Sequence, residues 1–119
     1  GVLNPVEIRA LDRTSHLMFS TDINAACPNS VIEALACGLP VLAYDTGALA
    51  EIVQNDSGKV VPWGSNYWKL EPPDLAPLVE AAQELLLNND RYRLQARQRA
   101  INAFSLDKMV EAYLEVLLA

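Results

Sequence analysis

The chain has 119 residues and a net charge of −6, and 51% of its residues are hydrophobic. This length gives room for one domain with a core of moderate size. The acidic balance argues against nucleic acid as a partner, because binding to a phosphate backbone requires a positive surface. No run of residues is long and apolar enough to span a membrane.

Cysteine and histidine usage limits the chemistry further. The two cysteines, Cys27 and Cys37, lie in an apolar context without a Cys framework or a secretory signal. We therefore expect reduced thiols and a cytoplasmic location. With a single histidine and no paired acidic motif, the sequence predicts neither a metal site nor a cofactor. His16 opens an apolar run, and we interpret it as a boundary residue rather than as a general acid or base.

The first part of the chain predicts a helix, a strand and a loop. Asn4 and Pro5 are typical of an N-cap and a first helical position, and the helix should continue to about Thr14. Residues 16–20 are apolar through their middle and predict a strand. Residues 21–27 then form the loop at the carboxyl end of that strand, where ligands bind in open α/β sheets.

The stretch from Cys27 to Gly47 predicts a helix that runs into a buried strand. Pro28 favours a helix start, with the Asn or Ser that follows it as a further cap or first-turn residue. The helix is apolar on every side except for one carboxylate, so we expect it to be buried. Gly38 predicts its end, and residues 41–44 predict a strand of a parallel sheet covered on both faces.

Glu33 is the exception in that helix, and it has two interpretations. A buried carboxylate is costly unless a partner satisfies it, so Glu33 could cap the helix or pair with a basic neighbour. Alternatively, it faces a crevice and accepts hydrogen bonds from ligand hydroxyls. The free amides of Asn29, Ser30 and Val31 would then lie one turn away, where helix N-termini bind phosphate.

The middle of the chain predicts a short helix and one more strand. Residues 48–54 suit a short helix with Thr46 as its N-cap. Glu51 falls on this helix. Residues 59–61 predict a strand that ends at Pro62, a residue tolerated at a sheet edge.

The second half of the chain predicts three helices after an irregular segment. Asp74 should cap a helix with apolar residues spaced by three and four, and residues 88–90 should break it. Ser105 should cap a final helix. Its apolar side chains are expected to face inward: Met109, Val110, Tyr113, Leu114 and Leu117.

Two clusters in this half have alternative interpretations. Residues 63–73 contain Trp63, Tyr67 and Trp68, which could form a platform for carbohydrate, although we favour a cover over the core. The helix that follows residue 90 carries four arginines, for which we favour a solvated face over contact with an anionic membrane surface. These are Arg91, Arg93, Arg97 and Arg99.

Several motifs occur in a family-specific order. They are Pro-Asn-Ser-Val-Ile-Glu-Ala-Leu-Ala-Cys-Gly-Leu-Pro-Val (28–41), Asp-Thr-Gly (45–47), Glu-Ile-Val (51–53) and Gly-Lys-Val-Val-Pro (58–62). As a set they resemble the donor-binding half of retaining group 1 (family 4) glycosyltransferases, which have the GT-B fold. The resemblance implies transfer of a sugar from a nucleotide-diphosphate sugar to an unknown acceptor, with a separate N-terminal acceptor domain as partner. We expect the isolated fragment to be inactive.

The resemblance also implies roles for individual residues. The second carboxylate of the family's Glu-x7-Glu motif maps onto Glu33 and implies contact with the ribose, while the helix-start amides would meet the diphosphate. The first carboxylate of that motif, which contacts the transferred sugar, is replaced here by Ala25. The candidate sugar contacts are the residues of the preceding loop: Asp22, Asn24, Ala25, Ala26 and Cys27. No residue of this chain is implied as a catalytic nucleophile.

Together these observations predict an α/β fold, a partial Rossmann-like domain with a short parallel sheet flanked by helices. Residues 1–119 would form a single partial nucleotide-sugar-binding domain. Its donor-site core would span residues 1–62, and the aromatic loop and C-terminal helices residues 63–119. We expect an exposed strand edge open to self-association. Two other functions remain open: a nucleotide-sugar epimerase of the same fold, and a non-catalytic domain that binds a nucleotide or a partner.

Overall fold

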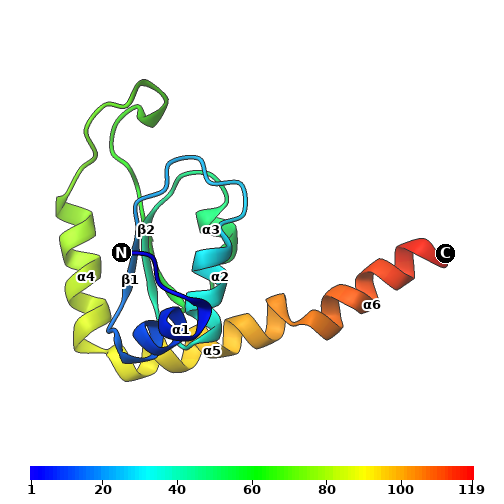
Figure 1. Cartoon of the computed structure of the whole chain (residues 1–119). Coiled ribbons are helices and arrows are strands. Elements are labelled where there is room, and N and C mark those ends of the chain that lie inside the picture. The colour runs from blue at the N-terminus through cyan, green and yellow to red at the C-terminus, as the bar shows by residue number, and fades with distance from the viewer.

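The computed structural model describes residues 1–119 and has an open, three-stranded parallel sheet. The strands are β1 (Met18–Ser20), β2 (Val41–Tyr44) and β3 (Gly58–Val61), in the order β1-β2-β3. The helices are α1 (Pro5–Thr14), α2 (Asn29–Ala36), α3 (Leu49–Ile52), α4 (Ala76–Leu87), α5 (Asn89–Phe104) and α6 (Leu106–Leu117), with a single 3₁₀ turn at Tyr67–Lys69 (Figure 1). The predicted α/β fold is confirmed.

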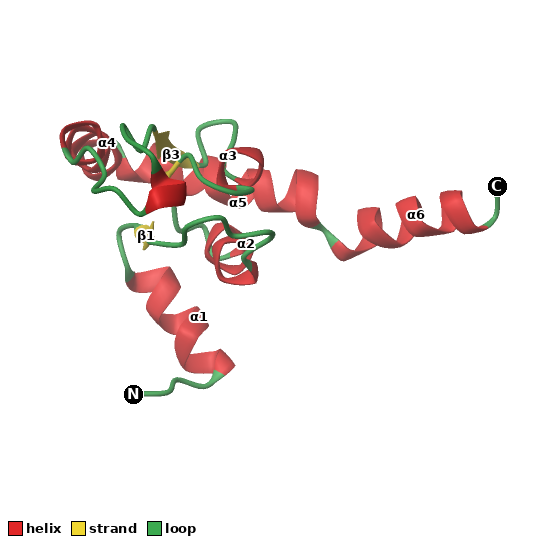
Figure 2. Ribbon diagram, turned by 90° about the horizontal axis from the view of Figure 1, so that it is seen from above, coloured by secondary structure: helices red, strands yellow, loops and turns green.

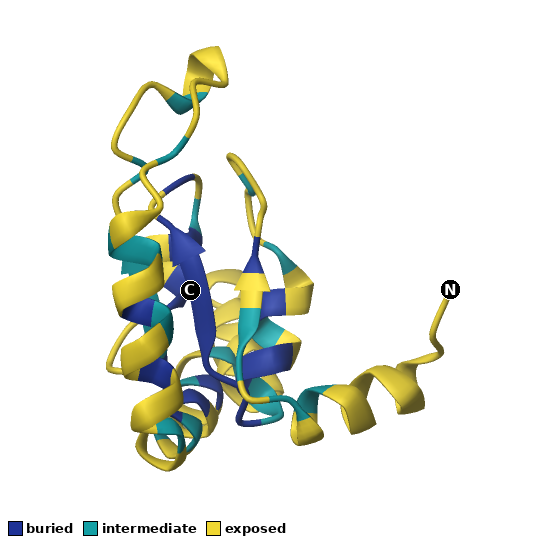
Figure 3. Ribbon diagram, turned by 90° about the vertical axis from the view of Figure 1, so that its left-hand side faces the viewer, coloured by how far each residue is buried: buried dark blue, intermediate teal, exposed yellow.

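The central strand β2 separates two hydrophobic cores. Val41 and Ala43 point to one side, where they pack with residues of α2, α3 and α5. Leu42 and Tyr44 point to the other side, where they meet α4 and Tyr92. This alternation follows from the two-residue period of a strand. Seen from the end of the sheet, α4 lies on one face and α2 and α3 on the other (Figure 2), and β2 is buried along its length (Figure 3).

Local sequence signals account for most helix boundaries. Asn4 and Glu7 form the reciprocal capping box of α1, with Asn4 Oδ1 accepting from the Glu7 amide at 3.0 Å. Gly38 follows α2 with a φ of +71°, the left-handed conformation that ends helices. Asp74 accepts a hydrogen bond from the Ala76 amide at the start of α4. The predicted Thr46 cap is wrong, because α3 begins after Ala48 and Thr46 is buried.

The arginines of α5 hold the carboxyl ends of three other helices. Arg93 donates to the carbonyls of Arg13 and Ser15 at the end of α1, and Arg97 donates to Ala36 at the end of α2. Arg99 donates to two carbonyls at the end of α3, at 2.8 and 3.1 Å. Guanidinium groups satisfy the free carbonyls and the negative dipole there.

The expected solvated face is therefore wrong for Arg93 and Arg99, which are half-buried, whereas Arg97 is exposed but also binds a helix end. The fourth, Arg91, pairs with Asp56 at the surface. Contact with an anionic membrane stays a prediction, and most of the guanidinium groups it would use already bind within the chain. Their role was hidden in the sequence because each partner carbonyl lies at least 47 residues away.

A polar cluster joins β3, α4 and α5 on the opposite face of the sheet. The Tyr92 hydroxyl donates to Glu84 Oε1 at 2.5 Å, and Lys59 Nζ lies 2.8 Å from the same oxygen. The hydrogen bonds from Lys59 and Tyr92 lower the pKa of Glu84, and the bond to Glu84 raises that of Lys59. The Tyr92 ring is buried beneath this cluster and anchors α5 to the second core.

Helix α6 extends away from the rest of the molecule (Figures 1 and 2). No residue of α6 is buried, so the predicted inward packing of its apolar side chains is wrong. The helix itself forms as predicted, with the Ser105 hydroxyl accepting from the Lys108 amide, but no element of the chain faces its apolar side. None of the helices has both the length and the apolar character needed to cross a membrane.

Replacing Arg99 by Met should lower the free energy of unfolding by about 1 kcal/mol, because two charge-assisted hydrogen bonds to α3 are lost. Urea denaturation followed by circular dichroism measures the change. Arg91→Met is the matched control, since its exposed ion pair should contribute little. Equal effects of the two substitutions would contradict a capping role for Arg99.

Candidate functional site

Two loops meet at the carboxyl ends of the strands, where a ligand was predicted. The loop after β1, residues 21–28, is held by the turn after β2. Thr46 Oγ1 donates to the Asp22 carbonyl at 3.1 Å, and the Ala48 amide donates to the Ala25 carbonyl at 2.8 Å. Gly47 has a φ of +56°, and a Cβ placed there would lie 2.4 Å from the Ala25 oxygen. Only glycine fits between these two loops.

The predicted sugar-contact residues all lie on this braced loop. The exposed members are Asp22, Asn24, Ala26 and Cys27. Asn24 adopts a left-handed φ of 60°, which turns the chain toward α2. Ala25 is half-buried, and its backbone carbonyl is already hydrogen-bonded. Its methyl group offers no polar atom to a sugar.

Helix α2 begins with unsatisfied amides. Its N-cap is Pro28, and no side chain caps it. Of the two roles predicted for Asn29 and Ser30, that of first-turn residue is confirmed and that of cap is wrong. The Val31 amide donates to the Pro28 carbonyl at 3.1 Å. The amides of Asn29 and Ser30 have no acceptor in the chain. Free amides at a helix start attract anions, because the helix dipole adds to their positive charge.

Glu33 is exposed and makes neither an ion pair nor a hydrogen bond within the chain. The predicted all-round burial of α2 is wrong: Val31, Ala34 and Leu35 form its buried face, whereas Glu33 lies on the opposite side. That side of α2 faces α1 across an open pocket. Because the Glu33 carboxylate stays in contact with solvent, its charge needs no partner within the chain. Asn29 and Glu33 are four residues apart and share a face of the helix.

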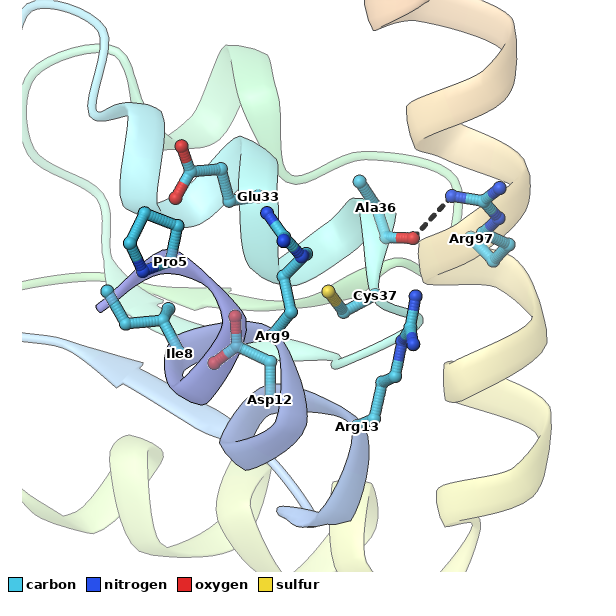
Figure 4. Close-up of a pocket in the computed structure, with 9 residues that line it drawn as sticks. All are labelled: Pro5, Ile8, Arg9, Asp12, Arg13, Glu33, Ala36, Cys37 and Arg97. Atoms are coloured by element: carbon cyan, nitrogen blue, oxygen red, sulfur yellow. Dashed lines mark hydrogen bonds between the residues drawn. The ribbon is translucent and has the colours of Figure 1, made fainter. Parts of the chain in front are cut away.

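The pocket beside Glu33 lies between α1, α2 and α5 and has a volume of about 460 Å³. Figure 4 shows its charged side chains projecting into this space. Three arginines and two carboxylates line it, so its local charge is positive although the whole chain is acidic. Burial, together with the nearby Glu33 charge, raises the pKa of Asp12. The lining residues are Pro5, Ile8, Arg9, Asp12, Arg13, Glu33, Ala36, Cys37 and Arg97.

Helix α1 contributes to this pocket, which the sequence does not predict. Arg9, Asp12 and Arg13 recur at three- and four-residue spacing, which marks a charged face of the predicted helix. Nothing in the sequence shows that this face turns toward Glu33, because the two helices are connected through β1 and a long loop. Arg97 lies still farther along the chain.

The model of one protein family, described as glycosyl transferases group 1, matches residues 1–103. The chain belongs to this family. No curated protein matches the sequence significantly. Within the group 1 family, the match covers all three strands and extends through most of α5, so the sheet, α2 and the pocket all lie inside the matched region.

The remaining residues of interest are the two cysteines, the single histidine and Glu51. Cys27 is exposed and Cys37 half-buried, and both are free thiols. No three His, Cys, Asp or Glu side chains are arranged to hold a metal ion. His16 is exposed two residues before β1, and its carbonyl accepts a hydrogen bond from Asn89. Glu51 supplies a backbone carbonyl to Arg99, so its backbone has a structural role.

Gly47→Ala should displace the loop before α2, since the added methyl would collide with backbone atoms of Ala25 at 2.4 and 2.6 Å. We expect a loss of more than about 1 kcal/mol of unfolding free energy, from the collision and the positive φ together. Thermal denaturation measures it. Gly1→Ala, at a glycine with nothing nearby, is the control. Wild-type stability of Gly47→Ala would show that the two loops are not tightly joined.

Proposed function

We propose that this group 1 domain binds the donor of a retaining glycosyltransferase, a nucleotide-diphosphate sugar. The observation that carries the proposal is the juxtaposition of an unpaired carboxylate, Glu33, with free backbone amides one helical turn away. The ribose hydroxyls of a nucleotide diphosphate need a hydrogen-bond acceptor, and its phosphates need hydrogen-bond donors. In such a ligand the ribose and the phosphates are about as far apart as one helical turn, which is the separation of Glu33 from these amides.

Glu33 would accept hydrogen bonds from the ribose hydroxyls. An ionised carboxylate forms charge-assisted hydrogen bonds that are about twice as strong as neutral ones. The exposed position of Glu33 leaves both oxygens free for a ligand. The pocket of about 460 Å³ beside it is lined by Glu33 but not by the Asn29 and Ser30 amides, so the diphosphate would lie outside this pocket.

The amino end of α2 would bind the diphosphate. The Asn29 and Ser30 amides are the free donors, while the Val31 amide also has a bond to Pro28. Negative charge grows on the diphosphate as the bond to the sugar breaks, and preorganised amides stabilise that charge. This role requires no nucleophile, metal or cofactor from the chain. The loop residues Asp22 and Asn24 would contact the sugar.

A non-catalytic domain that only binds a nucleotide is a second candidate, and Ala25 is the observation that favours it. The position that carries a sugar-binding carboxylate in the resembled motif has a methyl group here, and its backbone carbonyl is used by Ala48. An assay of sugar transfer by the domain joined to an acceptor domain separates the two. Transfer favours the first candidate, and nucleotide binding without transfer or hydrolysis favours the second.

Glu33→Ala should weaken binding of nucleoside diphosphates at least about 10-fold, because hydrogen bonds to a charged group are lost. Isothermal titration calorimetry with UDP, GDP and ADP measures the affinities and identifies the preferred base. The substitution should not perturb folding, since Glu33 is exposed and without a partner.

Glu80→Ala is the matched control, an exposed glutamate on α4 that lies outside the pocket. It should bind like the wild type. Equal affinity of wild type and Glu33→Ala for all three nucleotides would contradict the ribose assignment, as would the absence of binding to any of them.

A further inference from the structure

Residues 63–74, here called the aromatic arm, form a closed loop that rises from the end of β3 (Figure 1). Its base is fixed, because the Asp74 amide donates to the Trp63 carbonyl at 2.7 Å and the Tyr44 hydroxyl donates to the Asp74 carbonyl at 3.0 Å. The arm stands at the same end of the sheet as the loop before α2 (Figure 1).

The tip of the aromatic arm is also fixed by hydrogen bonds. Glu71 accepts from the Asn66 amide at 2.9 Å through its carboxylate and from Trp63 Nε1 at 2.8 Å through its carbonyl. Asn66 caps the 3₁₀ turn by accepting from the Lys69 amide, and Leu70 closes the turn in a left-handed conformation. The tip is therefore preorganised rather than a free loop.

Aromatic rings run in contact from the sheet to this tip. Phe19, Tyr44, Trp63, Tyr67 and Trp68 follow one another with centroid distances of 6.5, 4.9, 6.4 and 5.4 Å. Trp63 packs on the second core, which confirms the expected cover. Trp68 is not part of this cover, because 73% of its surface is exposed. The neighbouring Leu70 is 74% exposed.

We propose that Trp68, supported by Tyr67, is a stacking surface for a pyranose ring; the proposal rests on the sugar-transfer function above. The apolar C–H face of a sugar ring complements the electron-rich face of an indole. Asn66 and Lys69 flank the two aromatic residues in the chain, and their side-chain nitrogen atoms are hydrogen-bond donors of the kind that sugar hydroxyls accept. The pyranose would come from either the acceptor or the donor sugar.

Charge favours a neutral sugar over an anionic membrane at this tip. Lys69 is the one cation of the arm and Glu71 opposes it, while the chain as a whole has a net charge of −6. A negative membrane surface repels such a chain unless a cluster of basic residues faces it. The arginine cluster of α5 is engaged in bonds to other helices.

Nuclear magnetic resonance tests the proposal, because the two tryptophans give two indole N–H signals. The chain is titrated with methyl α- and β-glycosides of glucose, galactose, mannose and N-acetylglucosamine, with nucleotide sugars, and with vesicles containing phosphatidylglycerol. We expect at least one glycoside or nucleotide sugar to shift the Trp68 indole signal and to leave that of Trp63 nearly unchanged. A shift with glycosides identifies an acceptor sugar, and a shift with nucleotide sugars alone identifies the donor sugar.

Trp68→Ala, followed at the backbone amides of the arm, should weaken that binding about 2- to 10-fold. Leu87→Ala, at another exposed apolar side chain, should leave it unchanged. Nucleoside diphosphate binding should persist in Trp68→Ala, so a failure of the arm is distinguishable from a failure of the Glu33 site. The proposal is overturned if no sugar shifts the Trp68 signal, if Trp68→Ala binds as well as wild type, or if only the vesicles perturb Trp68.

Discussion

Helix α2 is fixed at both of its ends, and the geometry of the candidate site depends on this constraint. At the carboxyl end, Arg97 of α5 binds the Ala36 carbonyl. Before the amino end, the loop is held against Gly47, whose lack of a side chain permits a backbone approach that any other residue would block. The buried face of α2 then packs on β2. With these restraints in place, the free amides and Glu33 are presented to solvent together.

The positive side chains of this acidic chain are concentrated near the carboxyl end of α2, away from the amides at its amino end that are proposed to bind an anion. Most positive groups of the chain are on α5 and α1, and those lining the pocket gather around one open space beside Glu33. The arginines of α5 cap helices at the amino-end side of the sheet, opposite the end where the free amides of α2 lie. The proposed anion site therefore depends on the free amides and the helix dipole rather than on the charge of nearby side chains.

The sequence predicted the elements that depend on local chemistry. The Asn4 cap, the Gly38 helix end, the buried β2 and the Ser105 cap all result from residues within a few positions of one another. The sequence did not predict the contacts between segments that lie far apart along the chain. The sequence predicts a cap at Thr46, but the Thr46 hydroxyl holds the loop before α2. It predicts solvated arginines on α5, but three of them bind helix ends. The apolar side of α6 predicted burial, although no element of the chain covers it. Periodicity shows which face is apolar and does not show what packs on it.

The account depends most directly on the amino end of α2. Heteronuclear magnetic resonance spectra of the chain, recorded with and without UDP, GDP and ADP, report on each backbone amide. The account predicts that at least one of these nucleotides produces its largest shifts at the Asn29 and Ser30 amides, with smaller changes around Glu33. Shifts confined to α4 or α6, with these two amides unchanged at saturation, would contradict it.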